Sequence, residues 1–293
     1  MYSAIAANKR RTWLILFLFV VLIAALGYVA GLVYGHSYTF TALALVIAGV
    51  YALIQYFAAA KIALAINGAQ EIEKKDSPAY YRVVENLSIA AGLPMPKVYL
   101  MDDPAPNAFA TGRDPNHSAV CATTGLLDIM NDTELEAVLA HEISHVRNYD
   151  IRVMVIVFGL VSAIGLIADL IMNFFWFGGR NDREQQNPIF LIIGIAAALL
   201  APLIAFLIQM AVSRRREYLA DSSGALLTRY PEGLASALEK IRDNGSTLKR
   251  PNTSTAHLFF ANPLSKKSFA NLFSTHPPIE DRIARLRNMG TKL

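Results

Sequence analysis

Two histidines and a glutamate have the residue types and the spacing of a zinc-dependent hydrolase. They belong to the segment His141-Glu142-Ile143-Ser144-His145. Residues four apart lie on the same face of a helix, so both imidazoles can bind one zinc ion at nitrogen distances of about 2 Å. Glu142 points to the side of the ion, where its carboxylate can take a proton from a zinc-bound water whose pKa falls to about 7. The segment therefore predicts a catalytic zinc site, and the alternative is a helix that carries two surface histidines.

A catalytic zinc also needs a third protein ligand, while its fourth position is left for water. The histidines outside the motif are His36, His117, His257 and His276. We favour Glu217, because it follows a long apolar segment that can return the chain to the motif helix. Asp221 lies one helical turn later and can orient a ligand histidine by accepting its other ring proton. The alternative is that Glu217 pairs with the arginines that precede it.

Four apolar segments are long enough to cross a bilayer, which takes about 20 residues of helix. They cover about residues 13–33, 39–60, 151–177 and 188–212. Apolar residues make up 54% of the chain and charged residues 17%, with a mean hydropathy of +0.35. The third segment contains Asp169, a charge that is costly in lipid unless it is paired or near water. We therefore expect a membrane protein with two hairpins of transmembrane helices.

The positive charges beside these segments predict the orientation of the chain. Lys9–Arg11 precede the first segment and Arg214–Arg216 follow the fourth, whereas the loop at 34–38 has no lysine or arginine. Both termini and residues 61–150 are therefore expected on the cytoplasmic side. The single cysteine, Cys121, cannot form an internal disulfide, which agrees with a reducing compartment. The net charge of +4 and the lack of basic blocks interleaved with aromatics predict no binding of nucleic acid.

The chain accordingly divides into four parts. We expect a transmembrane hairpin over 1–60, a protease part with the motif helix over 61–150, a second hairpin over 151–212, and a protease part with Glu217 over 213–293. Residues 97–101, 107–112 and 118–123 have strand character and predict a small antiparallel sheet of about three strands. Asn131-Asp132-Thr133 offers an N-cap for the motif helix, which can continue through Tyr149 into the third span.

The chain resembles the HtpX family of bacterial membrane metalloproteases, relatives of the eukaryotic prenyl-protein endoprotease. The matching segments are residues 107–110, 134–145 and 216–221, and Ser-Thr-His-Pro-Pro at 274–278 followed by Arg282. The resemblance covers nearly the whole chain. It implies a mainly α fold, with four transmembrane helices and a cytoplasmic zincin-like α+β domain. One zinc ion would be held by His141, His145 and Glu217.

The resemblance also assigns roles to individual residues. Glu142 would be the general base, and Asp221 the partner of His141. His276 or Arg282 would stabilise the oxyanion, although Arg282 could instead pair with a neighbouring acidic residue. Residues that would hold the substrate backbone as an added strand are Asn107, Ala108, Phe109 and Ala110.

Together these features predict an integral membrane zinc endopeptidase of the plasma (inner) membrane. It would be anchored in the lipid bilayer and cleave membrane or membrane-associated proteins at cytoplasmic sites, and the resemblance adds a role in membrane protein quality control. One alternative is a protease of lipidated peptides. Another is a non-catalytic membrane scaffold or channel, which would bind no metal.

Overall fold

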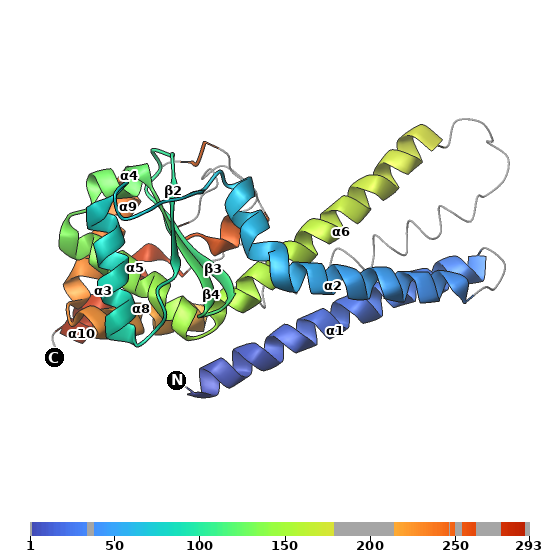
Figure 1. The fold of residues 1–293 in the computed structure, drawn as a ribbon, viewed down its shortest axis with the longest axis horizontal. Coiled ribbons are helices and arrows are strands. Elements are labelled where there is room, and N and C mark those ends of the chain that lie inside the picture. Colours follow the sequence, from blue (N-terminus) through green and yellow to red (C-terminus); the bar gives the residue numbers. More distant parts are fainter. Residues whose placement is uncertain are drawn as a thin grey trace.

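A computed structural model describes residues 2–33, 38–178, 214–245, 247–249, 254–261 and 277–290. Three long helices, α1, α2 and α6, extend from a body that contains the sheet and the remaining helices (Figure 1). The expected fourth span at 188–212, the loop before it and His276 lie outside the described residues.

The first two apolar segments form the helices α1 (Tyr2–Val33) and α2 (Thr39–Ile66). Both are long and apolar enough to cross a membrane, with mean hydropathies of 2.6 over Ile5–Val29 and 2.0 over Thr39–Ile66. The two helices lie side by side (Figure 1). They approach so closely at Gly27 that a β-carbon there would lie 2.5 Å from the Ala44 side chain. Large apolar side chains such as Phe57 stay exposed on α2, as expected of a surface that faces lipid.

The third apolar segment forms α6 (Asp150–Gly178), directly after the motif helix α5 (Asp132–Arg147). The sequence allowed one helix to run through Tyr149, and that prediction is wrong because the two helices bend by 79°. Tyr149 has a φ of 61°, which a right-handed helix cannot contain. The described residues therefore hold two candidate spans, or three if α5 and α6 are counted as one broken span.

The sheet contains β1 (Gln70–Glu71), β2 (Lys97–Met101), β3 (Ala108–Asp114) and β4 (His117–Thr123), in the order β1-β2-β4-β3. The expected purely antiparallel sheet of three strands is wrong, because β2 pairs with β4 in parallel. The loop after β2 carries the chain past β4, and β3 then pairs with the other side of β4 as an antiparallel hairpin. β3 is consequently the last strand of the sheet, as the sequence predicted for the substrate strand.

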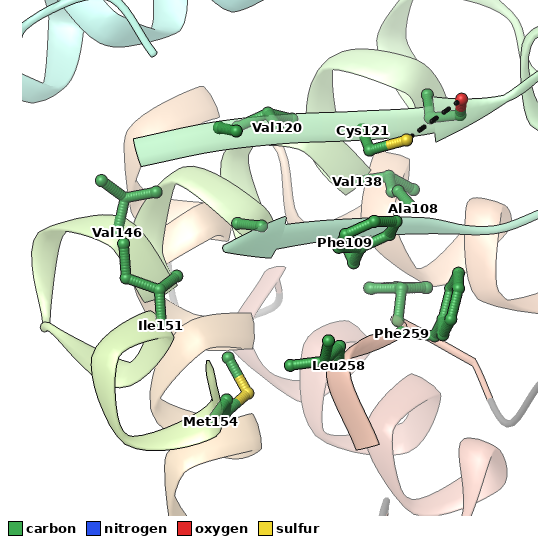
Figure 2. Packing of buried hydrophobic residues seen from close by; sticks show 14 of the residues in the cluster. Ala108, Phe109, Val120, Cys121, Val138, Val146, Ile151, Met154, Leu258 and Phe259 are labelled. Carbon is green, nitrogen blue, oxygen red and sulfur yellow. Dashed lines mark hydrogen bonds between the residues drawn. The ribbon is translucent and has the colours of Figure 1, made fainter. Parts of the chain in front are cut away.

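The core of the body lies where α5 and α6 both pack against β3. Figure 2 shows Val138 and Val146 of α5, Ile151 and Met154 of α6, and Phe109 of β3 within one buried cluster. The remaining helices of the body are α3 (Pro78–Ala91), α4 (Thr124–Ile129), α8 (Arg214–Thr228), α9 (Pro231–Asn244), the 3-10 turn η1 (Ala256–Leu258) and α10 (Ile279–Gly290). Of these, α3, α8 and α9 pack directly against α5, so the motif helix is enclosed on several sides.

Candidate active site

The motif helix starts at a capping box that the sequence predicted only in part. Asn131 Oδ1 accepts a hydrogen bond of 2.9 Å from the Glu134 backbone N–H, and Glu134 Oε2 accepts one of 2.9 Å from the Asn131 N–H. Glu134 is held in turn by Ser236 and Lys240 of α9, each at 2.6 Å. The start of α5 is therefore fixed both by its own sequence and by a neighbouring helix.

The three predicted zinc ligands meet in the interior of the body. Nε2 of His141 and Nε2 of His145 lie 3.0 Å apart. The carboxylate oxygens of Glu217 lie 3.7 Å from the first nitrogen and 3.6 Å from the second. Ligands around a tetrahedral zinc at 2.0–2.1 Å stand roughly 3.3 Å apart, so two imidazoles and one carboxylate at these separations fit zinc.

α8 presents Glu217, Asp221 and Gly224 on one face, because positions i, i+4 and i+7 of a helix align. That face lies against α5. A β-carbon on Gly224 would come within 2.9 Å of the His141 backbone nitrogen. The glycine thus lets α8 come close enough to α5 for Glu217 to reach the two histidines, a contribution that the sequence analysis missed.

Each ligand histidine has a carboxylate close to its other ring nitrogen, and of the two contacts only that of His145 has the geometry of a hydrogen bond. Asp221 Oδ1 lies 2.9 Å from Nδ1 of His141, which is the proximity that the sequence predicted. Asp150 Oδ2 lies 3.1 Å from Nδ1 of His145 and was missed. Asp150 follows His145 by five residues, and in a straight helix it would point away from the histidine. The contact could therefore be predicted only if the bend at Tyr149 were known. Such carboxylates fix the orientation of the imidazole and leave Nε2 for the metal.

The electrostatics of the site without metal follow from burial and from these partners. Burial lowers the pKa of His141 to about 4. Burial also opposes the charge of His145, but Asp150 and Glu217 together raise its pKa to about 9. The neutral Nε2 of His141 can therefore accept a hydrogen bond from the protonated Nε2 of His145. A metal that binds both nitrogens must displace that proton.

Glu142 is buried beside the strand β3. Burial raises the pKa of its carboxylate to about 7, against the lowering effect of the nearby backbone N–H of Ala110. A carboxylate with a pKa near neutrality can both accept and return a proton. Its place between the ligand cluster and the edge strand suits a general base that works on a bound backbone.

Arg282 of α10 is fully buried and contacts Asp221 with two donors. Its Nε lies 2.9 Å from Oδ2 and its Nη2 lies 2.7 Å from Oδ1. Burial opposes the charge of Asp221, yet Arg282 and His141 lower its pKa to about 2. The alternative that Arg282 pairs with a neighbouring acidic residue on its own helix is therefore wrong. Its charge is directed to the carboxylate behind His141.

A short segment after η1 lies against the expected substrate strand. The backbone N–H of Phe260 donates a hydrogen bond of 2.8 Å to the Ala108 carbonyl, and Asn107 pairs with the backbone of Ala261 in both directions, at 2.9 and 3.0 Å. The Phe260 ring lies 4.9 Å from the ring of His141. Residues 107–110 are buried, and no pattern in the sequence indicated this covering segment.

Comparison with known proteins agrees with this site. Peptidase family M48 matches residues 74–290. A protein described as Protease HtpX homolog from Tropheryma whipplei is 53% identical over 293 residues, covering 100% of this chain and 99% of the relative. A second one, from Dictyoglomus turgidum, is 48% identical over 300 residues, covering 99% of this chain and 95% of the relative.

A solved structure has a similar fold. The crystal structure of S. mikatae Ste24p matches with a TM-score of 0.52 and 23% identity, over 93% of this chain and 61% of that one. This chain therefore spans about three fifths of that protein, and the likeness concerns the fold. From the family match, the HtpX relatives and the ligand cluster, we conclude that this chain belongs to peptidase family M48 as an HtpX-type membrane metalloprotease, whose zinc ligands are His141, His145 and Glu217.

Proposed function

We propose that this protease cleaves membrane or membrane-associated proteins on the cytoplasmic side of the plasma (inner) membrane, in membrane protein quality control. The observation that carries the proposal is the position of Glu142, which is buried one residue after the ligand His141 and next to the backbone of Ala110 in the edge strand. The long apolar helices α1 and α2 support the part of the proposal that places the substrate at the membrane.

In the proposed mechanism, Glu142 accepts a proton from the attacking water and then delivers it to the leaving amine nitrogen. Bound zinc would lower the pKa of a coordinated water toward about 7 and polarise the scissile carbonyl. Asp221 and Asp150 keep the imidazoles of His141 and His145 turned toward one point. The reaction consumes one water and releases a new carboxylate and a new amine.

Asn107 to Ala110 would hold the substrate as an added strand. Within the described part of the chain β3 has a strand partner on one side only, and the Ala108 carbonyl already accepts a hydrogen bond from the backbone N–H of Phe260. This edge can therefore pair with a backbone, and a substrate strand would have to displace Phe260 from Ala108 to do so. Recognition through main-chain hydrogen bonds gives broad rather than sequence-strict specificity.

We propose that Arg282 or His276 stabilises the oxyanion. Arg282 is fully buried and gives two donors to Asp221, so its remaining guanidinium N–H groups are the ones that would contact the oxyanion. A cation in such surroundings stabilises developing negative charge far better than one in water. His276 is the other candidate because of its place in the family motif.

The arrangement of α1 supports an active site on the cytoplasmic side. Asn8 contacts the bend next to the zinc ligands, so the neighbouring cluster Lys9–Arg11 lies on the same side of the span as the site. Positive clusters of this kind mark the cytoplasmic side. In this proposal residues 1–60 and 151–212 anchor the chain, and residues 61–150 and 213–293 form the protease.

Glu142→Ala tests the proposal. The variant should keep about one zinc per chain and lose cleavage of a casein-like substrate, because only the base is removed. Glu136→Ala is the matched control, since Glu136 lies on the exposed side of the same helix. Cleavage that persists in Glu142→Ala would contradict the mechanism. Reporter fusions within 178–187 should report the external side, and a cytoplasmic signal there would refute the orientation.

A further inference from the structure

The bend between α5 and α6 is held in a conformation that its own sequence does not favour. Tyr149 adopts a φ of 61°, a left-handed conformation in which a residue with a β-carbon is rare. Such residues persist where the surrounding contacts hold them, and they cluster at functional sites. The bend lies directly between the ligand His145 and its carboxylate partner Asp150.

The contact that secures this bend comes from the start of α1. The side-chain amide of Asn8 donates one hydrogen bond of 2.9 Å to the Asn148 carbonyl and a second of 2.7 Å to Asp150 Oδ1. Asn8, Asn148 and Asp150 are all buried, with 3%, 2% and 1% of their surface exposed. Nearby, Lys9 Nζ lies 4.5 Å from the centre of the Tyr149 ring. One amide therefore links the end of α5 to the beginning of α6.

The two oxygens of Asp150 have separate partners. Oδ1 accepts the hydrogen bond from Asn8, and Arg216 Nε lies 3.8 Å from the same oxygen. Oδ2 faces Nδ1 of His145 at 3.1 Å. Because a carboxylate is rigid and planar, fixing Oδ1 also fixes where Oδ2 points. The position of Asn8 is thus transmitted to the ring of a zinc ligand.

We propose that Asn8 is a positioning residue of the zinc site, acting on His145 through Asp150. A buried amide in an apolar helix is unfavourable unless its donors are satisfied. Here both N–H groups of the Asn8 amide donate to the bend, one to Asn148 and one to Asp150. An apolar side chain would serve helix packing better. On this proposal the first membrane helix is part of the active-site architecture as well as an anchor.

The test measures zinc affinity, which does not depend on proteolysis. Full-length protein in detergent is titrated with zinc in competition with a chromogenic chelator. Asn8→Ala should bind zinc about tenfold more weakly, at the lower end of the 10- to 100-fold range for outer partners of metal ligands. Asp150→Ala should weaken binding at least as much. The double variant should bind no more weakly than Asp150→Ala alone, because Asn8 acts through Asp150.

Thr12→Val is the matched control. Thr12 is fully buried one turn further along α1, and its hydroxyl donates only to the Asn8 backbone carbonyl. This variant should keep the zinc affinity of the wild type. If Asn8→Ala folds too poorly to be purified, Asn8→Ser replaces it, since a hydroxyl carries one donor for two acceptors and should weaken binding several-fold.

Three results would overturn the proposal: an Asn8 variant within twofold of the wild type, independent and multiplicative losses in the double variant, or an equal loss in Thr12→Val. The last result would mean that any change in the packing of α1 disturbs the site. A wild-type protein that binds no zinc would instead refute the metalloprotease itself, so the two failures are distinguishable.

Discussion

Gly224→Ala should weaken zinc binding although it removes no ligand. An added β-carbon would lie 2.9 Å from the His141 nitrogen, 3.1 Å from its Cα and 3.2 Å from the Ala140 carbonyl carbon. All three are backbone atoms that cannot turn aside. Ordinary contacts begin at 3.4 Å, so α8 must move away from α5 by roughly 0.5 Å.

That displacement bears directly on the metal. Glu217 lies seven residues before Gly224 on the same face of α8, so it moves outward with the helix. Metal–ligand distances tolerate only about 0.2 Å. Overpacking typically costs about 1–3 kcal/mol. The metal-free protein can relieve this strain by letting α8 move, whereas the zinc-bound protein must keep the ligands together. Zinc affinity should therefore fall by roughly 5- to 150-fold.

Chelator competition on purified protein measures this loss. Gly49→Ala is the control, because a β-carbon on that helical glycine meets nothing within 4 Å. It should leave the zinc affinity unchanged. If Gly224→Ala also binds zinc like the wild type, the close approach of α8 does not determine the geometry of Glu217, and the reasoning fails.

Three further predictions concern buried groups in and near the site. Arg282→Met should destabilise the metal-free protein by about 3–5 kcal/mol in denaturant unfolding, because it leaves Asp221 buried without its guanidinium partner. The double variant Arg282→Met/Asp221→Asn should recover much of that loss, and an equal loss in the single and double variants would contradict the prediction. Burial raises the pKa of Glu142 from 4.5 to about 7, so its ionisation destabilises the metal-free fold increasingly as pH rises from the first value to the second. Glu142→Gln should therefore increase the free energy of unfolding by roughly 3 kcal/mol at pH 8 and by almost nothing at pH 4. A gain independent of pH would refute this. The Cys121 thiol is buried and its pKa is raised, so labelling with maleimide requires unfolding. Labelling should slow by about 100-fold when free zinc is at 100 times its Kd, and Glu217→Ala should lose this response to zinc. Labelling of the wild type at the same rate with zinc and with a chelator would argue against the site.

The features that sequence analysis predicted correctly depend on local patterns. The spacing of His141 and His145 has one geometric meaning on a helix, and Asn131 with Glu134 marks where that helix begins. The end position of β3 did not follow from such a pattern and was expected only from the resemblance to proteases that bind substrate at an edge strand. Glu217 was harder to predict as the third ligand, because its proximity to the two histidines depends on the packing of two helices that are distant in sequence. It was favoured because it follows an apolar segment that can return the chain to the motif helix.

The features that were missed depend on distant contacts or on unusual backbone. Asn8 and Asp150 are 142 positions apart, and neither belongs to a motif. No glycine or proline stands at or beside Tyr149 to signal the bend, so the sequence was consistent with one continuous helix. The parallel pairing of β2 with β4 depends on where a connecting loop crosses the sheet, which the strand patterns do not specify.

The missed contacts explain why the site can be built at all. HExxH supplies two ligands and a base from one helix, but a straight continuation of α5 would have carried Asp150 away from His145. The left-handed turn at Tyr149 brings it back, at the cost of a strained residue that α1 then holds through Asn8. On the other side, the absence of a side chain at Gly224 admits the helix that brings Glu217 and Asp221. The two histidines are thus oriented by opposite parts of the chain, His141 by α8 and His145 by the bend that α1 secures.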